Sequence, residues 1–130
     1  MTKYRNELSQ NMEYIYSCRS LIRGFYLNLN QSEEYKLTSL ISNYINSNIS
    51  PKYNCDVVIN IKEFNISINN IDMEKIGHNK LMSISSGIFS ILHDYLLNNA
   101  NNEIKNYLSD EAKHPIFDFF IIGNSIKFLL

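Results

Sequence analysis

The stretch that decides the fold of this chain is its last fourteen residues, Phe117-Asp-Phe-Phe-Ile-Ile-Gly-Asn-Ser-Ile-Lys-Phe-Leu-Leu130. Gly123-Asn124 is a two-residue turn signal between two alternating runs, and it predicts a β-hairpin. A lone hairpin is only marginally stable in water, so this one is expected to belong to a larger sheet that packs on a core. The predicted cross-strand pairs are Ile122 with Ser125, Ile121 with Ile126, Phe119 with Phe128 and Phe117 with Leu130.

The two faces of this hairpin differ in character. One face is wholly apolar, while the other mixes Phe120, Ile122 and Leu129 with Asp118, Ser125 and Lys127. This second face is too apolar for a freely solvated sheet surface. We expect a helix of the same domain to cover it, with a contact to a partner as the alternative. Exposed Phe120 and Leu129 side chains would assign the hairpin to an interface.

A second hairpin is predicted in the middle of the chain from a change of phase. Apolar residues alternate on odd positions from 55 to 61 and on even positions from 64 to 68. A single strand cannot change phase in this way without a bulge. A hairpin that turns at Lys62-Glu63 can do so, and it pairs Ile59 with Ile66 and Val57 with Ile68. Because Lys-Glu is poor turn chemistry, a bulge or a longer loop remains open.

Apolar residues at helical spacing predict helices over residues 3–29, over 80–98 and, more briefly, over 103–112. A further helix is predicted to begin at Ser32 as its N-cap and to end before Asn46. Residues 69–79 are expected to form a loop. The whole chain, 1–130, is thus predicted to be a single α+β domain, with an antiparallel sheet of about four strands built from two hairpins and packed with three to four helices. The predicted order is α-α-β-β-α-α-β-β.

Composition limits the classes of function. The formal net charge of −1 argues against a protein that binds nucleic acid through a phosphate footprint. No signal peptide and no apolar run of membrane-spanning length is visible, so a cytoplasmic chain with reduced Cys18 and Cys55 is expected. The 19 Asn and 19 Ile against two Ala indicate AT-rich coding, as in a low-GC bacterium, a phage, a virus or an acquired genomic island. The oligomeric state is left open.

No group of residues has the spacing of a catalytic or metal site, so we predict neither an enzyme nor a cofactor nor a bound metal. The alternative is a small enzyme or ligand-binding domain whose site assembles from dispersed residues such as His93, His114 and Asp118. Arg19 and Arg23 lie one turn apart on one helical face, where like charges repel. An acidic partner is expected to compensate them, either Glu13, a neighbouring helix or another molecule.

Binding to a protein is the function that these features favour. Nine Tyr is a high number for this length, and tyrosine is enriched in protein interfaces because it combines area, stiffness and a polar group. Acidic pairs in predicted loops and helix starts form candidate acidic surface. The residues predicted to bind a partner are Glu33, Glu34, Tyr35, Tyr53, Asp72, Glu74, Asp110 and Glu111.

In size and composition the chain resembles the small immunity proteins that bacteria pair with secreted or contact-delivered toxins. The resemblance implies a non-catalytic protein that neutralises a toxin domain, a nuclease among the candidates, by covering its active site. The acidic residues would then meet a basic cleft, with tyrosines as anchors. A self-associating regulatory module that uses an exposed sheet edge is a third hypothesis.

Overall fold

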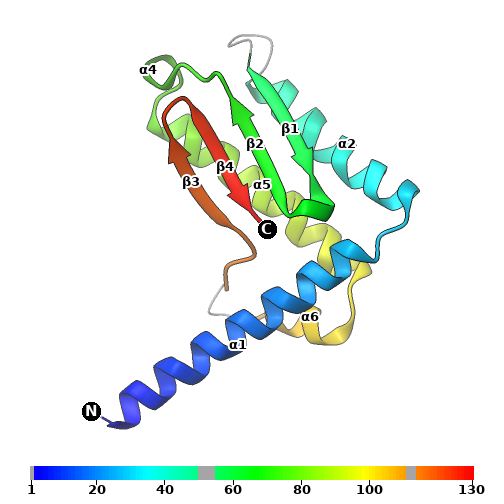
Figure 1. Ribbon diagram of the computed structural model, residues 1–130, viewed down its shortest axis with the longest axis vertical. Helices are drawn as coiled ribbons and strands as arrows, with labels where there is room; N and C mark the ends of the chain where they lie inside the picture. The colour runs from blue at the N-terminus through cyan, green and yellow to red at the C-terminus, as the bar shows by residue number, and fades with distance from the viewer. Residues whose placement is uncertain (1, 50–54, 111–113) are drawn as a thin grey trace.

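The computed structural model describes residues 2–49, 55–110 and 114–130 of the chain. Within these ranges it contains five α-helices and one four-stranded antiparallel sheet, in the predicted order of an α+β domain (Figure 1). The elements are α1 (Thr2–Leu27), α2 (Gln31–Asn48), β1 (Asp56–Asn60), the 3-10 turn η1 (Ile61–Glu63), β2 (Asn65–Asn69), α4 (Met73–Ile76), α5 (His78–Asn99), α6 (Asn102–Leu108), β3 (Asp118–Ile122) and β4 (Ser125–Leu129).

The sheet joins the two predicted hairpins. Its strand order is β1-β2-β4-β3, so β2 and β4 are central and every neighbouring pair is antiparallel. Both predicted registers are confirmed where the strands pair. Val57 lies opposite Ile68 and Ile59 opposite Ile66 in the first hairpin. In the second, the confirmed pairs are Phe119 with Phe128, Ile121 with Ile126 and Ile122 with Ser125.

The first hairpin turns through a longer loop than Lys62-Glu63 alone. Residues Ile61–Glu63 form a single 3-10 turn, and Phe64 follows it in the left-handed region with φ of 60°. The Phe64 N–H donates to the Ile61 carbonyl oxygen at 3.0 Å, which closes the loop. Lys and Glu do not readily take the positive φ angles of a two-residue turn. The positive φ angle of this loop is instead at Phe64. The Phe64 ring lies 5.7 Å from the guanidinium carbon of Arg23.

The second hairpin turns at Gly123-Asn124, as predicted. Of these two residues only Gly123 has a positive φ, 57°. A positive φ at the first turn position alone is the pattern of a type II′ turn, which favours glycine at that position. The turn therefore has the right-handed twist of the strands that it joins.

One face of the sheet packs on the core. The central strands contribute Ile66, Ile68, Ile126 and Phe128, whose side chains are fully buried. Figure 1 shows α5 behind the strands and α2 along the β1 edge of the sheet, on the same side. The predicted stripe of α5 is confirmed, since Leu81, Ile84, Ile88, Leu92 and Leu96 are all buried.

Helices α2 and α5 approach closely at Gly87. The Tyr44 hydroxyl donates to the Ser83 carbonyl oxygen at 3.1 Å. A Cβ atom at Gly87 would lie 1.9 Å from the Tyr44 hydroxyl oxygen, so only glycine leaves room for this contact. On α2, the predicted residues Leu37, Ile41 and Ile45 are buried, whereas Leu40 is 52% exposed. The buried stripe of α2 is thus narrower than the sequence indicates.

Two helix starts differ from the predictions. Helix α2 begins two residues earlier than expected, with Asn30 rather than Ser32 as its N-cap. The Asn30 side chain accepts from the Glu33 N–H, and the Glu33 carboxylate accepts from the Asn30 N–H, which is a complete capping box. The predicted loop over 69–79 contains the short helix α4, which Asp72 caps, and the first two residues of α5.

Helix α1 contacts α6 and the η1 turn rather than lying across the sheet. Its C-terminal half buries Cys18, Ile22 and Tyr26, while Met12 is 48% exposed. In Figure 1 the N-terminal part of α1 runs past the rest of the domain. None of the helices in the described ranges combines the length and the apolarity that a membrane span requires.

Candidate protein-binding face

The face of the sheet opposite the core is open. Side chains from three strands are substantially exposed on it: Val58 is 51%, Phe120 43%, Ile122 58% and Leu129 42% exposed. Figure 1 shows no helix in front of the strands on this side, in the part of the chain that the structure describes. Exposed apolar side chains that gather on a sheet face, unlike single ones, indicate a contact surface. We call this surface the open face.

Three of these residues form a continuous group, which we call the β3–β4 patch: Phe120, Ile122 and Leu129. Phe120 and Ile122 are next neighbours on one face of β3, because side chains alternate along a strand. Leu129 pairs with Asp118, which makes it the diagonal neighbour of Phe120. Val58 lies apart from the patch. Across the sheet, Val58 pairs with Ser67, Ser67 with Lys127, and Lys127 with Phe120. Val58 is therefore three strand spacings, or about 14 Å, from Phe120.

The expectation that a helix covers this face was wrong. Phe120 and Leu129 are exposed, which was the stated condition for assigning the hairpin to an interface. The physical reason is the position of α1. Its two arginines bind the end of the closing hairpin, so the helix crosses the end of the sheet and leaves the face free (Figure 1).

Arg19 and Arg23 fix the closing hairpin to α1. The Arg19 Nη1 donates to both carboxylate oxygens of Asp118 at 3.1 Å, and its Nη2 donates to the Leu129 carbonyl oxygen at 3.2 Å. The Arg23 Nε donates to the backbone oxygen of Leu130 at 2.9 Å. The acidic partner that the sequence required is thus Asp118, from the same chain and 99 positions away.

Arg19→Met is expected to lower the free energy of unfolding by about 1–2 kcal/mol, because it removes one half-exposed ion pair and one charge-assisted bond to a backbone oxygen. The measurement is urea unfolding followed by circular dichroism. Lys36→Met is the matched control, since Lys36 is exposed and forms no ion pair within the described ranges, so a change within about 0.5 kcal/mol is expected there. Equal effects of the two substitutions would contradict the anchoring role of Arg19.

The residues predicted to bind a partner are not gathered on this face. Three of them lie at the start of α2, where Glu33 belongs to the capping box. The Glu34 Oε2 lies 3.8 Å from the Lys62 Nζ, and Tyr35 is 73% exposed. Glu34 and Tyr35 border an open hollow of about 310 Å³ together with Ile59. Their role in binding remains a prediction.

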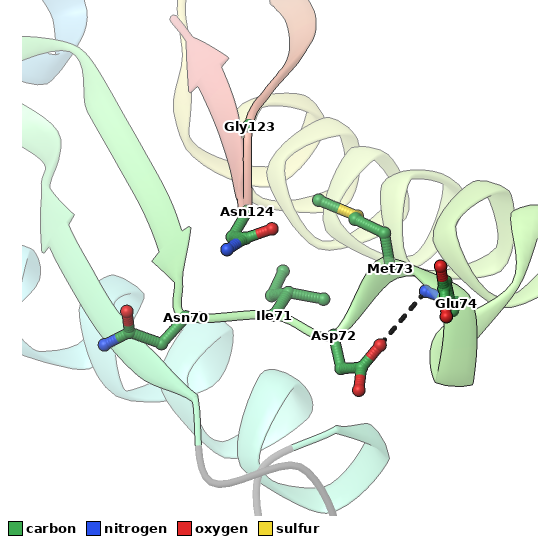
Figure 2. Close-up of a pocket in the computed structure, with 7 residues that line it drawn as sticks. All are labelled: Asn70, Ile71, Asp72, Met73, Glu74, Gly123 and Asn124. Carbon is green, nitrogen blue, oxygen red and sulfur yellow. Dashed lines mark hydrogen bonds between the residues drawn. The ribbon is translucent and has the colours of Figure 1, made fainter.

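Asp72 and Glu74 lie at a second place, beside the tip of the closing hairpin. They line an open hollow of about 630 Å³, shown in Figure 2, between the β2–α4 connection and the β3–β4 turn. The Ile71 N–H donates to the Asn124 carbonyl oxygen at 2.9 Å, which joins the two sides. The Asp72 carboxylate accepts from the Glu74 N–H at 3.2 Å, so it also caps α4. Among the described members of the predicted set, this pair lies beside the turn at Gly123-Asn124, which directly follows Ile122 of the patch.

The remaining predicted residues lie elsewhere. Asp110 follows α6, and its Oδ2 lies 2.9 Å from the His114 Nε2. Glu111 and Tyr53 lie outside the described residues. The structure thus places the described members of the predicted set in three separate regions.

The alternative site of His93, His114 and Asp118 is not assembled by the contacts of these side chains. His93 contacts the Leu108 carbonyl oxygen through Nε2 at 3.3 Å. His114 pairs with Asp110 and stacks on Tyr107 with ring centroids 4.8 Å apart, while Asp118 pairs with Arg19. In the described ranges no three His, Cys, Asp or Glu side chains are grouped so as to hold a metal ion.

The two cysteines have the environment of structural residues. Cys18 is buried on α1 and Cys55 is half-buried just before β1. Burial raises the pKa of both thiols, and in Cys18 it outweighs the opposing hydrogen bond with Tyr14. A raised pKa keeps a thiol protonated at neutral pH, and the protonated form is a poor nucleophile.

Comparison with known proteins gave no match to a family model, to a curated protein or to a solved structure. The exposure and placement of the side chains on the open face are therefore what define the candidate site. Sequence reasoning missed Val58 as a member of the open face, although its even position in an odd-phased strand is the signal that places it there.

Proposed function

We propose that this chain is a non-catalytic binding protein that recognises another protein through the β3–β4 patch. The observation that carries the proposal is the exposure of Phe120, Ile122 and Leu129 on a sheet face that the described helices leave open. Aromatic and aliphatic side chains at the centre of a patch with a polar rim are typical of binding hot spots. Here Lys127 lies beside Phe120, and Asp118 lies beside Leu129.

We further propose that the partner is a bacterial toxin domain and that this chain is its immunity protein, acting in the cytoplasm of the cell that makes both. The resemblance in size and composition to such proteins supports this step. A rigid sheet face suits the covering of an active site, because little conformational entropy is lost on binding. Asp72 and Glu74, beside the tip of the closing hairpin, are the acids of the described predicted set that would meet a basic cleft such as that of a nuclease.

The test uses the protein encoded immediately upstream of this gene as the candidate toxin. When it is produced in a laboratory bacterial host, growth is expected to stop and to be restored by co-production of this chain. Phe120→Asp is expected to abolish the rescue, and Val58→Asp, which adds the same charge on the same face but outside the patch, is expected to preserve it. A toxic upstream product that this chain neither neutralises nor binds after purification would refute the immunity role.

A further inference from the structure

Strand β3 lies at one edge of the sheet, with β4 as its only strand neighbour in the described residues. Because the turn has two residues, Ile122 and Ser125 form a hydrogen-bonded pair, and hydrogen-bonded pairs then recur at every second position. Phe119 and Ile121 fall on the positions between, so their N–H and C=O groups point away from β4. Within the described ranges these four groups have no backbone hydrogen-bond partner.

The side chains of this edge lack the usual protection against pairing. Natural edge strands carry lysine, proline, bulges or inward-pointing charges that prevent association. Strand β3 reads Asp-Phe-Phe-Ile-Ile, and Phe120, Ile121 and Ile122 are 43%, 49% and 58% exposed. Its single charge, Asp118, is already paired with Arg19. The opposite edge differs, because β1 contacts α2.

We propose that β3 pairs antiparallel with β3 of a second copy of this chain, about a twofold axis that passes beside Phe120. In this register Phe119 lies opposite the partner copy's Ile121, and Ile121 lies opposite the partner copy's Phe119. All four unpaired backbone groups of each strand then form hydrogen bonds with the other copy. Phe120 faces Phe120 of the partner copy as a non-hydrogen-bonded pair, in which side chains approach most closely.

Charge selects this arrangement over a parallel one. Antiparallel pairing places Asp118 opposite the partner copy's Ile122, and the two Asp118 residues stand four residues or about 13 Å apart along the strands. The two Lys127 residues stand three strand spacings or about 14 Å apart across the sheet. Both separations exceed the Debye length of about 8 Å at physiological ionic strength. Parallel pairing in register would instead place Asp118 next to Asp118.

The result would be an eight-stranded sheet in which the open faces of two copies are continuous. This inference concerns the edge of β3, whereas the proposed function concerns the face of the sheet, so the two stand independently. A substitution at Ile121 tests the edge pairing without changing the β3–β4 patch, because the Ile121 side chain lies on the helix-facing side of β3.

The first test is sedimentation equilibrium of the purified full chain. The wild-type protein is expected to sediment as a dimer at micromolar concentration. Ile121→Pro removes an N–H that points to the edge and leaves the β3–β4 bonds intact, so it is expected to give a folded monomer. Ile121→Thr keeps the N–H and is the matched control, expected to remain dimeric. Should Ile121→Pro unfold, Ile121→Lys, which adds a charge at a half-exposed edge position, replaces it with the same expectation.

The second test detects the register by cross-linking. In a Cys55→Ser background, Phe120→Cys is expected to form a disulfide-linked dimer on mild oxidation, seen by non-reducing electrophoresis. Val58→Cys, which is also exposed on the open face but lies on the other edge strand, β1, is expected to give none. A monomeric wild-type protein at these concentrations, or a dimer that survives both Ile121→Pro and Ile121→Lys, would overturn the proposal. A monomeric protein that instead binds an extended segment of another protein at this edge would overturn it as well.

Discussion

Replacing Phe128 by alanine is expected to lower the free energy of unfolding by about 3–5 kcal/mol, a large share of the 5–15 kcal/mol that stabilises a typical domain. Phe128 is fully buried on central strand β4. Its ring contacts those of Phe117 and Phe119, each with centroids 5.2 Å apart. Truncation would leave a cavity between two strands and the helices behind them. Urea unfolding of the purified variant measures the loss.

Phe120→Ala is the matched control for this experiment. The same side chain is removed from the same hairpin, but Phe120 is 43% exposed on the open face. We expect it to lower the free energy of unfolding by less than about 1 kcal/mol, since nearly half of the Phe120 side chain is already in contact with solvent in the folded chain. If the two substitutions destabilised the protein equally, the open face would be covered in solution, and the assignment of the two sheet faces would be wrong.

Phe120→Asp is expected to weaken binding to the protein partner by at least about 30-fold, which corresponds to a hot-spot contribution of about 2 kcal/mol. The substitution removes the largest apolar side chain of the β3–β4 patch. It also puts a charge into a surface from which binding would exclude water. Isothermal titration calorimetry with the purified upstream gene product measures the change.

Val58→Asp provides the control for affinity. It adds the same charge on the open face, about three strand spacings from Phe120, and is expected to change the affinity by less than about threefold. An unchanged affinity for Phe120→Asp with a large loss for a Glu34 or Tyr35 substitution would move the binding site to the start of α2.

The registers of both hairpins could be predicted because alternation and turn chemistry are local properties. If the apolar side chains of both strands share a face, Val57 must lie opposite Ile68 and Ile59 opposite Ile66. The stripe of α5 follows from helical spacing for the same reason. Asn30 also carried a local signal, because Glu33 stands three positions later as a capping box requires.

The open face could not be predicted because it depends on a contact across most of the chain. Helix α1 crosses the end of the sheet, where Arg19 pairs with Asp118, and the residues near either one carry no local signal of this pairing. The acidic set was dispersed for a related reason. Glu33 and Asp72 are used in helix caps, and Glu34 faces Lys62, so charges that looked free in the sequence have partners within the fold.

Hydroxyl-radical footprinting of the complex with the upstream gene product tests the central claim most directly, because it reports the solvent access of individual side chains. The β3–β4 patch and the start of α2 make opposite predictions. If the open face binds the partner, oxidation of Phe120 and Leu129 falls on complex formation, while that of Tyr35, which is 73% exposed in the free protein, is unchanged. Protection of Tyr35 with unchanged oxidation of Phe120 and Leu129 would contradict the account.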